Sequence, residues 1–193
     1  MNNIEAFFDN IASKWDDMEC HSDEEKIRLL KEIGIKEGEL VIDVACGTGV
    51  ITDLIHDFSK SDVFGIDISH NMIEKAKVKY KDKTYAHFYH RDLLTLDETN
   101  TYDIAVIYNA YPHFLDPKAL SKKLYSILKE NGKFAIIHSL SREELTLHHK
   151  GRADSVSRVL NPIEEEAKYF LDLFNVIKAK EDDHSITLIC QKK

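Results

Sequence analysis

The chain has 193 residues, of which 43% are hydrophobic and 31% are charged, with few prolines and glycines. This is the size and composition of one ordinary globular domain, and it excludes a disordered chain. The formal net charge of -8 disfavours nucleic acid as a partner, because non-specific affinity for phosphate backbones comes mainly from lysine and arginine.

The cysteines and the apolar runs indicate the cellular compartment of the protein. Cys20, Cys46 and Cys190 form neither an even disulfide framework nor a C-x-x-C pair, and the first residues lack a secretory signal pattern, which together predict a reducing, cytoplasmic compartment. The longest apolar runs, such as 104–108, are far shorter than the roughly 20 residues of a membrane-spanning helix, so no span is expected. A homodimer is allowed by the sequence.

Helical and strand-like segments alternate along the first half of the chain. Ser22 is the expected N-cap of a helix, because Glu25 follows it by three residues and an amphipathic pattern continues to residue 33. The remaining elements predicted here are helices at 4–15, 51–58 and 71–80, and short strands at 40–44, 63–68 and 86–89.

The second half continues the same alternation. A strand at 102–108 precedes a helix at 117–128, and Glu130-Asn131-Gly132 is expected to stop that helix before a strand at 133–138. Residues 141–160 are polar and rich in histidine and arginine. A helix at 162–170 and a closing hairpin at 174–179 and 185–190 complete the prediction.

Alternating strands and helices are typical of βαβ units on a parallel sheet. We therefore predict an α/β fold with a single doubly wound, mostly parallel seven-stranded sheet, Rossmann-like, in one domain over residues 1–193. Helices of residues 1–38 precede this sheet.

The first strand-to-helix turn, Ala45-Cys46-Gly47-Thr48-Gly49, contains two glycines. Gly47 and Gly49 allow a tight turn that brings a ligand against backbone N–H groups at a helix N-terminus. Dinucleotide enzymes place G-x-G-x-x-G in the same position, but the third glycine of that pattern is replaced here by Thr52.

Carboxylates follow two later strands. Asp67 ends the second strand, where an acid can accept hydrogen bonds from both hydroxyls of a ribose. Asp92 follows the third strand, where it can accept from an adenine amino group while Leu93 packs on the ring. With Asp43 in the first strand, three acids are expected to line one crevice.

In this arrangement, Asp43 with the glycine turn, Asp67, and Arg91-Asp92 resemble the successive cofactor motifs of class I S-adenosylmethionine-dependent methyltransferases, over residues 40–138. Residues 7–16 resemble the opening of the small-molecule branch, similar to quinone-biosynthesis methyltransferases, in which this segment covers the cofactor. The family has glycine where this chain has Ala45, a departure that we expect to tighten the packing of the turn more than it alters binding.

The resemblance implies a cofactor, S-adenosylmethionine, and a small-molecule acceptor that receives its methyl group by in-line displacement. It implies an N-terminal lid at 1–38, a cofactor-binding core at 39–138 and an acceptor-side segment with the closing hairpin at 139–193. The expected cofactor contacts are Trp15, Asp43, Ala45, Cys46, Gly47, Gly49, Asp67, Ile68, Met72, Asp92, Leu93 and Asn109.

Acceptor contacts are expected after the fourth and fifth strands, because ligands of open α/β sheets lie beyond the carboxyl ends of the strands. One hypothesis makes a histidine the general base. A second makes His138, His148 and His149, with His113 as a further candidate, ligands of a divalent metal such as zinc. A third makes this segment a solvated helix or a mobile lid that does not meet the substrate. The catalytic candidates are His113, His138, His148 and His149, and the substrate-binding candidates are Tyr111, Arg142 and Arg152.

Three other functions remain open at this point. One is a non-catalytic S-adenosylmethionine-binding regulator that kept only the cofactor crevice. Another is a dinucleotide-dependent oxidoreductase, which the missing third glycine disfavours. The last is a methyltransferase of RNA or protein, which the acidic charge and short length disfavour.

Overall fold

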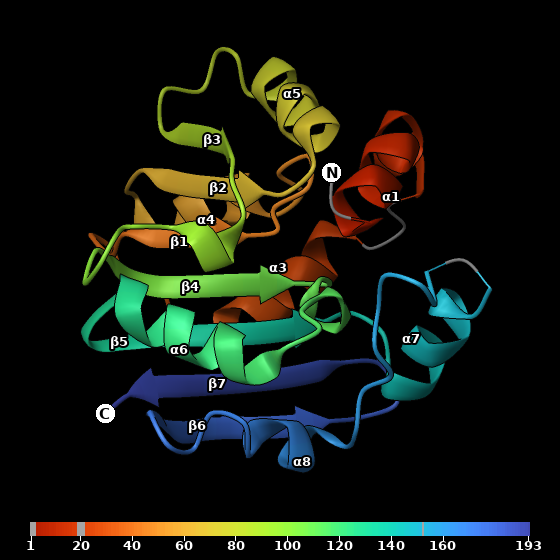
Figure 1. The fold of residues 1–193 in the computed structure, drawn as a ribbon. Coiled ribbons are helices and arrows are strands. Elements are labelled where there is room, and N and C mark those ends of the chain that lie inside the picture. The colour runs from red at the N-terminus through yellow and green to blue at the C-terminus, as the bar shows by residue number, and fades with distance from the viewer. Residues whose placement is uncertain (1–2, 19–21, 152) are drawn as a thin grey trace. The chain divides into compact units, whose positions relative to one another are not determined.

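The computed structural model describes residues 3–18, 22–151 and 153–193. The chain divides into two compact units, unit 1 at Met1–Asp97 and unit 2 at Glu98–Lys193. Among the described residues the strands have the order β3-β2-β1-β4-β5-β7-β6, which is a seven-stranded, mostly parallel sheet (Figure 1). This order confirms the predicted doubly wound α/β fold. No helix in the described ranges is long and apolar enough to cross a bilayer.

Unit 1 begins with the helices expected before the first strand. The Ser22 hydroxyl accepts from the Glu25 backbone N–H at 3.3 Å, so the predicted N-cap is confirmed. The segment expected as one helix at 4–15 is instead interrupted by a 3-10 turn. The elements are α1 (Asn3–Ile11), η1 (Ala12–Lys14), α2 (Trp15–Met18) and α3 (Asp23–Lys31).

Parallel strands form the sheet of unit 1. In the register, Asp43 lies opposite Gly65, and Asp67 lies opposite His90. Because the strands are parallel, their carboxyl ends share one edge, and the acids that follow them come to the same side. The elements are β1 (Val41–Val44), α4 (Thr52–Ser59), β2 (Val63–Asp67), α5 (His70–Lys79), β3 (Ala86–His90) and η2 (Leu93–Thr95).

Unit 2 combines a parallel pair with an antiparallel hairpin. β5 pairs with β4 in parallel and with β7 in antiparallel orientation, and β7 also pairs with β6. This pairing confirms the predicted closing hairpin, and Figure 1 shows α8 beside it. The elements are β4 (Tyr102–Tyr108), η3 (Tyr111–His113), α6 (Pro117–Ile127), β5 (Leu128–His138), α7 (Arg142–His149), α8 (Ile163–Ala167), β6 (Phe174–Glu181) and β7 (Ile186–Lys192).

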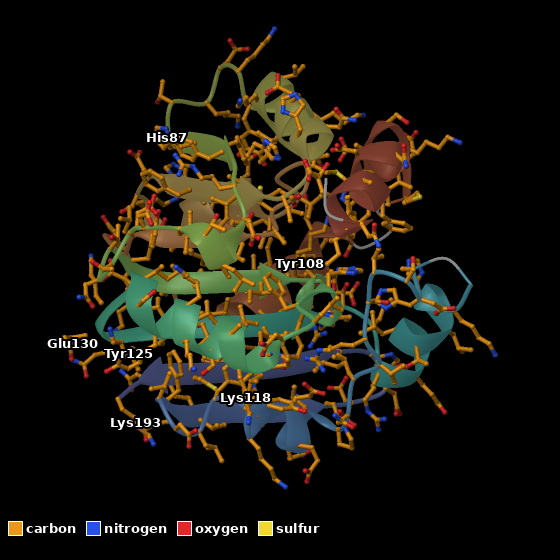
Figure 2. The ribbon with its side chains drawn as sticks, in the orientation of Figure 1. His87, Tyr108, Lys118, Tyr125, Glu130 and Lys193 are labelled. Atoms are coloured by element: carbon orange, nitrogen blue, oxygen red, sulfur yellow. The ribbon has the colours of Figure 1, made fainter. Side chains whose placement is uncertain are left out.

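The predicted stop at Glu130-Asn131-Gly132 is wrong. α6 ends at Ile127, and β5 begins directly at Leu128, so these three residues lie within the strand. The register with β4 shifts here, and Asn131 has a φ of 62°, as expected where a bulge bends a strand. Figure 2 shows Glu130 at the end of unit 2 where Lys193 also lies.

Three phenylalanines form an aromatic centre in the core of unit 2. The ring of Phe134 lies 4.7 Å from that of Phe170 and 4.9 Å from that of Phe174, measured between centroids, and all three side chains are fully buried. Burial of each ring stabilises the fold by roughly 1.5–3 kcal/mol. The pairs tie the segment after α8 and the start of β6 to β5.

Candidate cofactor site and histidine cluster

The glycine turn after β1 has a left-handed backbone at alternate residues. Ala45, Gly47 and Gly49 have φ values of 55°, 55° and 80°. At Gly49 a Cβ atom would lie 2.9 Å from the Tyr80 ring and 3.0 Å from the Phe88 ring, so a side chain does not fit. The Tyr80 hydroxyl also donates to the Gly49 carbonyl at 2.7 Å. Gly49 is therefore required by the turn, and Gly47 has the same left-handed backbone as Ala45.

Ala45 differs from the expectation made on the sequence. We expected this alanine mainly to tighten the packing of the turn, but its side chain is only half-buried and its φ of 55° is in the left-handed region. That conformation costs a residue with a Cβ roughly 1–2 kcal/mol. The main consequence of the alanine is thus backbone strain.

Two buried carboxylates flank the turn. Asp43 Oδ2 accepts from the Thr52 hydroxyl at 3.2 Å, and Asp43 Oδ1 has no hydrogen-bond partner among the described residues. Burial, reinforced by the negative charge of Asp67, raises the pKa of Asp43 to about 7. Burial also raises the pKa of Asp67 to about 6, although this carboxylate accepts from the Gly47 N–H at 2.9 Å and the Ser69 N–H at 2.8 Å.

Asp92 and Leu93 lie where the third strand of unit 1 ends. Asp92 is the N-cap of η2, and its Oδ1 accepts from the Leu94 N–H at 2.9 Å. Leu93 is buried, with 3% of its surface exposed. The structure therefore brings Asp43, Asp67 and Asp92 to the carboxyl edge of the same three strands, as the sequence predicted.

The N-terminal segment packs on the glycine turn. The Trp15 indole nitrogen lies 3.3 Å from the position that a Cβ on Gly47 would take, and the Asp16 carboxylate accepts from the Thr48 hydroxyl. Asp9 accepts from the Ser69 hydroxyl at 2.6 Å, which fixes the same segment to the start of α5. Trp15 thus lies at the glycine turn, and its contact with the cofactor stays a prediction.

Cys46 and Met72 face the core of unit 1. Burial raises the pKa of the Cys46 thiol well above its ordinary value, and the side chain packs with Ile73 and Phe88. Met72 has 1% of its surface exposed, whereas Ile68 is half-buried. Any contact of Cys46 with a ligand therefore involves its backbone.

Asn109 links the ends of two strands in unit 2. It follows β4 with a φ of 53°, its Oδ1 accepts from the Ser139 N–H at 2.9 Å, and its Nδ2 donates to the Ser139 hydroxyl at 2.8 Å. Asparagine tolerates this backbone conformation better than most residues with a side chain. Both polar atoms of the Asn109 side-chain amide are therefore hydrogen-bonded to Ser139 within unit 2.

Three of the predicted histidines gather in unit 2. The rings of His113 and His149 lie 5.3 Å apart, and His113 Nδ1 lies 2.9 Å from the Val156 carbonyl oxygen. His138 is fully buried, and neither ring nitrogen has a hydrogen-bond partner among the described residues. Burial, followed by the nearby His113 and His149, lowers the pKa of His138 to about 3. Burial likewise lowers the pKa of His149 to about 4 and that of His113 below its ordinary value.

The structure does not support the metal site predicted at His138, His148 and His149. Within 3–18, 22–151 and 153–193, no group of three or more histidine, cysteine, aspartate or glutamate side chains is arranged to hold a metal ion. The physical reason lies in the helix: His148 is exposed on α7, and its ring centroid lies 6.0 Å from that of the adjacent His149.

The substrate-binding candidates have partners within unit 2. Tyr111 is fully buried, and its hydroxyl donates to Glu166 Oε2 at 2.8 Å. Arg142 forms an ion pair with Glu181 at 3.2 Å. Arg152 lies outside the described residues. The hydroxyl of Tyr111 is therefore already bound within unit 2, and the charge of Arg142 is balanced by Glu181.

Sequence reasoning missed a buried ion pair. Arg158 donates to both carboxylate oxygens of Glu166, at 2.9 Å and 2.8 Å, and its guanidinium lies 4.5 Å from the centre of the Tyr111 ring. Glu166 also accepts from the Asn161 N–H at 2.8 Å. No sequence motif identifies this ion pair. The available indication is that a basic residue, Arg158, and an acidic residue, Glu166, lie on either side of Asn161-Pro162.

The chain is similar to known methyltransferases. It is 32% identical over 148 residues to the demethylmenaquinone methyltransferase of Staphylococcus saprophyticus, covering 70% of this chain and 62% of that protein. It is also 32% identical over 112 residues to the sterol 24-C-methyltransferase of Saccharomyces cerevisiae, covering 56% of this chain and 29% of that protein. The chain thus spans less than two thirds of the length of these relatives.

Solved structures have the same fold. A chain in the complex of a Haloferax volcanii methyltransferase activator with a methyltransferase has a TM-score of 0.81 and 20% identity, with 96% of this chain and 97% of that chain covered. An S-adenosylmethionine-dependent methyltransferase from Aquifex aeolicus has a TM-score of 0.73 and 20% identity, covering 94% and 98%.

The model of the methyltransferase domain family matches residues 35–186. This range contains the glycine turn, the three acids and the histidine cluster. The chain therefore belongs to the methyltransferase domain family and has the fold of the class I S-adenosylmethionine-dependent methyltransferases.

Proposed function

We propose that this chain transfers the methyl group of S-adenosylmethionine to a small, largely apolar molecule. The observation that carries the proposal is the pair of buried carboxylates beside the glycine turn, one of which, Asp43, has an oxygen with no hydrogen-bond partner among the described residues. Two buried acids with raised pKa values favour a cationic ligand, because a nearby positive charge stabilises their ionised forms.

The donor set fits S-adenosylmethionine. Each oxygen of Asp67 accepts one backbone N–H and keeps a further lone pair, so the carboxylate can still accept from ribose hydroxyls. Asp92 would accept from the adenine amino group, Leu93 would pack on the ring, and the backbone at Ala45 and Gly47 would meet the methionine portion. When bound, the cofactor supplies an electrophilic methyl group.

The protein's own part in such a reaction is mainly positioning. A reactant held within about 3–3.5 Å and in line reacts far faster than one free in solution. Trp15, packed on Gly47, would cover the turn and exclude water from it. Because the acceptor attacks the methyl group directly, the reaction needs no nucleophilic side chain of the protein.

The acceptor class rests on the relatives' names. One is a demethylmenaquinone methyltransferase and another a sterol 24-C-methyltransferase, both named for apolar small molecules. The formal net charge of -8 also disfavours RNA. A cytoplasmic location is part of the proposal, since Cys46 and Cys190 are free, buried thiols. The homodimer stays a prediction.

The first experiment measures cofactor binding. Calorimetric titration with S-adenosylhomocysteine should show binding, and NADH should show none. Asp67→Asn should weaken binding roughly tenfold or more, because hydrogen bonds to a charged group contribute about 1.5–3 kcal/mol. Asp82→Asn, an exposed acid of unit 1, is the matched control and should bind like the parent chain. Folded protein that takes up no S-adenosylhomocysteine would refute the proposal.

The second experiment identifies the acceptor class. Bacterial lipid extract and an RNA-plus-protein fraction are each incubated with the chain and S-adenosylmethionine labelled in the methyl group. Label that partitions into organic solvent supports the proposal. Label that precipitates with RNA or protein supports a macromolecular methyltransferase, and tight cofactor binding without any transfer supports the regulator.

A further inference from the structure

A cavity of about 360 Å³ lies in unit 2, between α7 and the segment that follows it. Leu145 and Leu160 are buried and give it an apolar floor, whereas Val159 is 74% exposed and stands at its mouth. The volume is near the lower end of the roughly 300–1,000 Å³ typical of small-molecule sites. The cavity therefore suits a compound of one or two rings.

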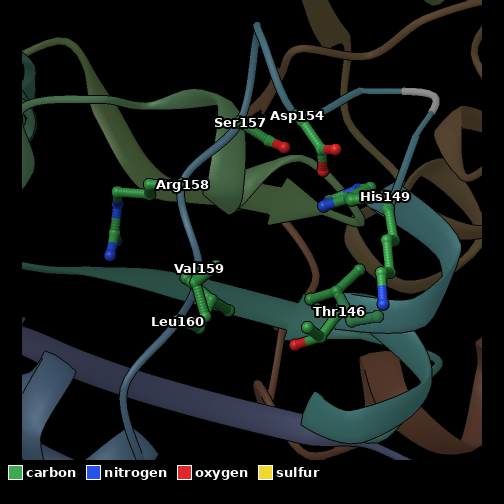
Figure 3. A pocket seen from close by; sticks show the side chains of 9 residues that line it. Thr146, His149, Asp154, Ser157, Arg158, Val159 and Leu160 are labelled. Atoms are coloured by element: carbon green, nitrogen blue, oxygen red, sulfur yellow. The ribbon is translucent and has the colours of Figure 1, made fainter.

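The charges of the lining are compensated. Arg158 lines the cavity, but both its terminal nitrogens donate to Glu166, and in Figure 3 its side chain extends away from His149 and Asp154. Lys150 and Asp154 contribute one charge of each sign. Both of these side chains are exposed, so among the described lining residues no unpaired cation lies at the buried floor of Leu145 and Leu160, and a carboxylate or phosphate placed there would lose hydration without a partner. The lining favours an uncharged ligand.

The hydroxyls of the lining already use their protons. Thr146 Oγ1 donates to the Arg142 carbonyl at 2.8 Å, and Ser157 Oγ donates to the Ala153 carbonyl at 2.7 Å. Each hydroxyl oxygen then offers lone pairs and no proton. These two hydroxyls thus present acceptors, and a ligand group that binds either of them has to donate.

His149 provides the third polar contact. In Figure 3 its ring and the Asp154 carboxylate point toward one another. The ring centroids of His113 and His148 lie 5.3 Å and 6.0 Å from that of His149, and no hydrogen bond from the described residues reaches the His149 ring nitrogens. Because burial lowers the pKa of His149 to about 4, its imidazole is neutral at pH 7 and offers one acceptor and one donor nitrogen.

We propose that this cavity binds a small, uncharged compound with an apolar body and a hydroxyl group that donates to Thr146, Ser157 or His149. Its assignment as the methyl acceptor rests on the proposed function; its binding to the cavity does not. Arg142, one of the substrate-binding candidates, does not favour an anionic ligand, because its charge is paired with Glu181.

The test compares three probes of one shape: 4-propylphenol, its methyl ether and 4-propylbenzoate. Each is titrated at pH 7 into the full chain and followed by amide chemical shifts. The phenol should bind roughly tenfold more tightly than either other probe, as expected when one hydrogen bond is lost or a charge is left unpaired. The shift changes should centre on residues 145–160.

Substitutions in the cavity test which side chain accepts the hydrogen bond from the phenol. Among His149→Leu, Thr146→Val and Ser157→Ala, the variant that removes the acceptor should weaken binding of the phenol several-fold, and His184→Leu, at an exposed histidine of unit 2 outside the lining, should leave it unchanged. Thr146→Val preserves the side-chain shape at an exposed position, so it remains informative if His149→Leu fails to fold. Equal affinity for the phenol and the ether, or shifts centred elsewhere, would overturn the inference.

Titration of the same samples with S-adenosylhomocysteine keeps the two proposals apart. If the cofactor product binds and the phenol does not, the cavity inference fails while the proposed function stands. If the phenol binds at residues 145–160 and the cofactor product does not bind, the proposed function fails while the cavity assignment stands.

Discussion

Replacing Ala45 by glycine is expected to stabilise the protein. Ala45 has a φ of 55°, which costs a residue with a Cβ roughly 1–2 kcal/mol. The greater freedom of an unfolded glycine offsets about 0.4–1 kcal/mol of the gain. The side chain is only half-buried, so little packing is lost. The net change is about 1 kcal/mol, which for a chain of this length is a rise in Tm of roughly 2–4 °C.

The assay is thermal and urea unfolding of the parent chain and two variants. Ala119→Gly is the matched control, because Ala119 is also half-buried but lies in α6 with an ordinary helical backbone. That change should destabilise by roughly 0.5–1 kcal/mol. If Ala45→Gly lowers Tm as Ala119→Gly does, the left-handed alanine carries no strain and the reasoning is wrong. Binding of S-adenosylhomocysteine to Ala45→Gly should be retained.

Three further predictions concern the buried groups. Glu166→Ala should destabilise by about 3 kcal/mol in urea unfolding, because it leaves Arg158 charged without its partner; a loss below 1 kcal/mol would contradict the pairing. The pKa of His138 is about 3 when folded and near 6.5 when unfolded, so its contribution to stability is present above pH 6.5 and lost as the pH falls toward 3. His138→Leu should therefore flatten the fall in the free energy of unfolding below pH 6.5, and an unchanged pH profile would argue against a buried neutral imidazole. The chain has one tryptophan, so its fluorescence should change when S-adenosylhomocysteine binds at Gly47, and no change at saturation by calorimetry would place Trp15 away from the ligand.

Local signals predicted most of the fold. The strand expected at 102–108 is β4 residue for residue, because the apolar run of residues 104–108 within it defines a buried strand. The caps also follow from local chemistry: Ser22 accepts from Glu25 N–H as expected. The three acids at the carboxyl edge were predictable because parallel pairing places successive strand ends on one side.

The errors arise where a distant segment decides the outcome. Asn131 and Gly132 resemble a helix stop, but pairing with β4 draws them into a bulged strand. The partners of Tyr111 and Arg142 are Glu166 and Glu181, 55 and 39 residues away, and no local pattern indicates either. The expectation for Ala45 differs from the structure for a local reason instead, since a residue type alone does not reveal its φ.

The position of β7 in unit 2 has a consequence for synthesis. β7 lies between β5 and β6 and pairs with both, although it follows both in the chain. While a ribosome is still translating residues 186–192, β5 and β6 each keep an open edge of unpaired N–H and C=O groups. Unit 2 is therefore exposed to association with other nascent chains until that last insertion, which makes folding yield in a cell sensitive to premature termination anywhere in β7.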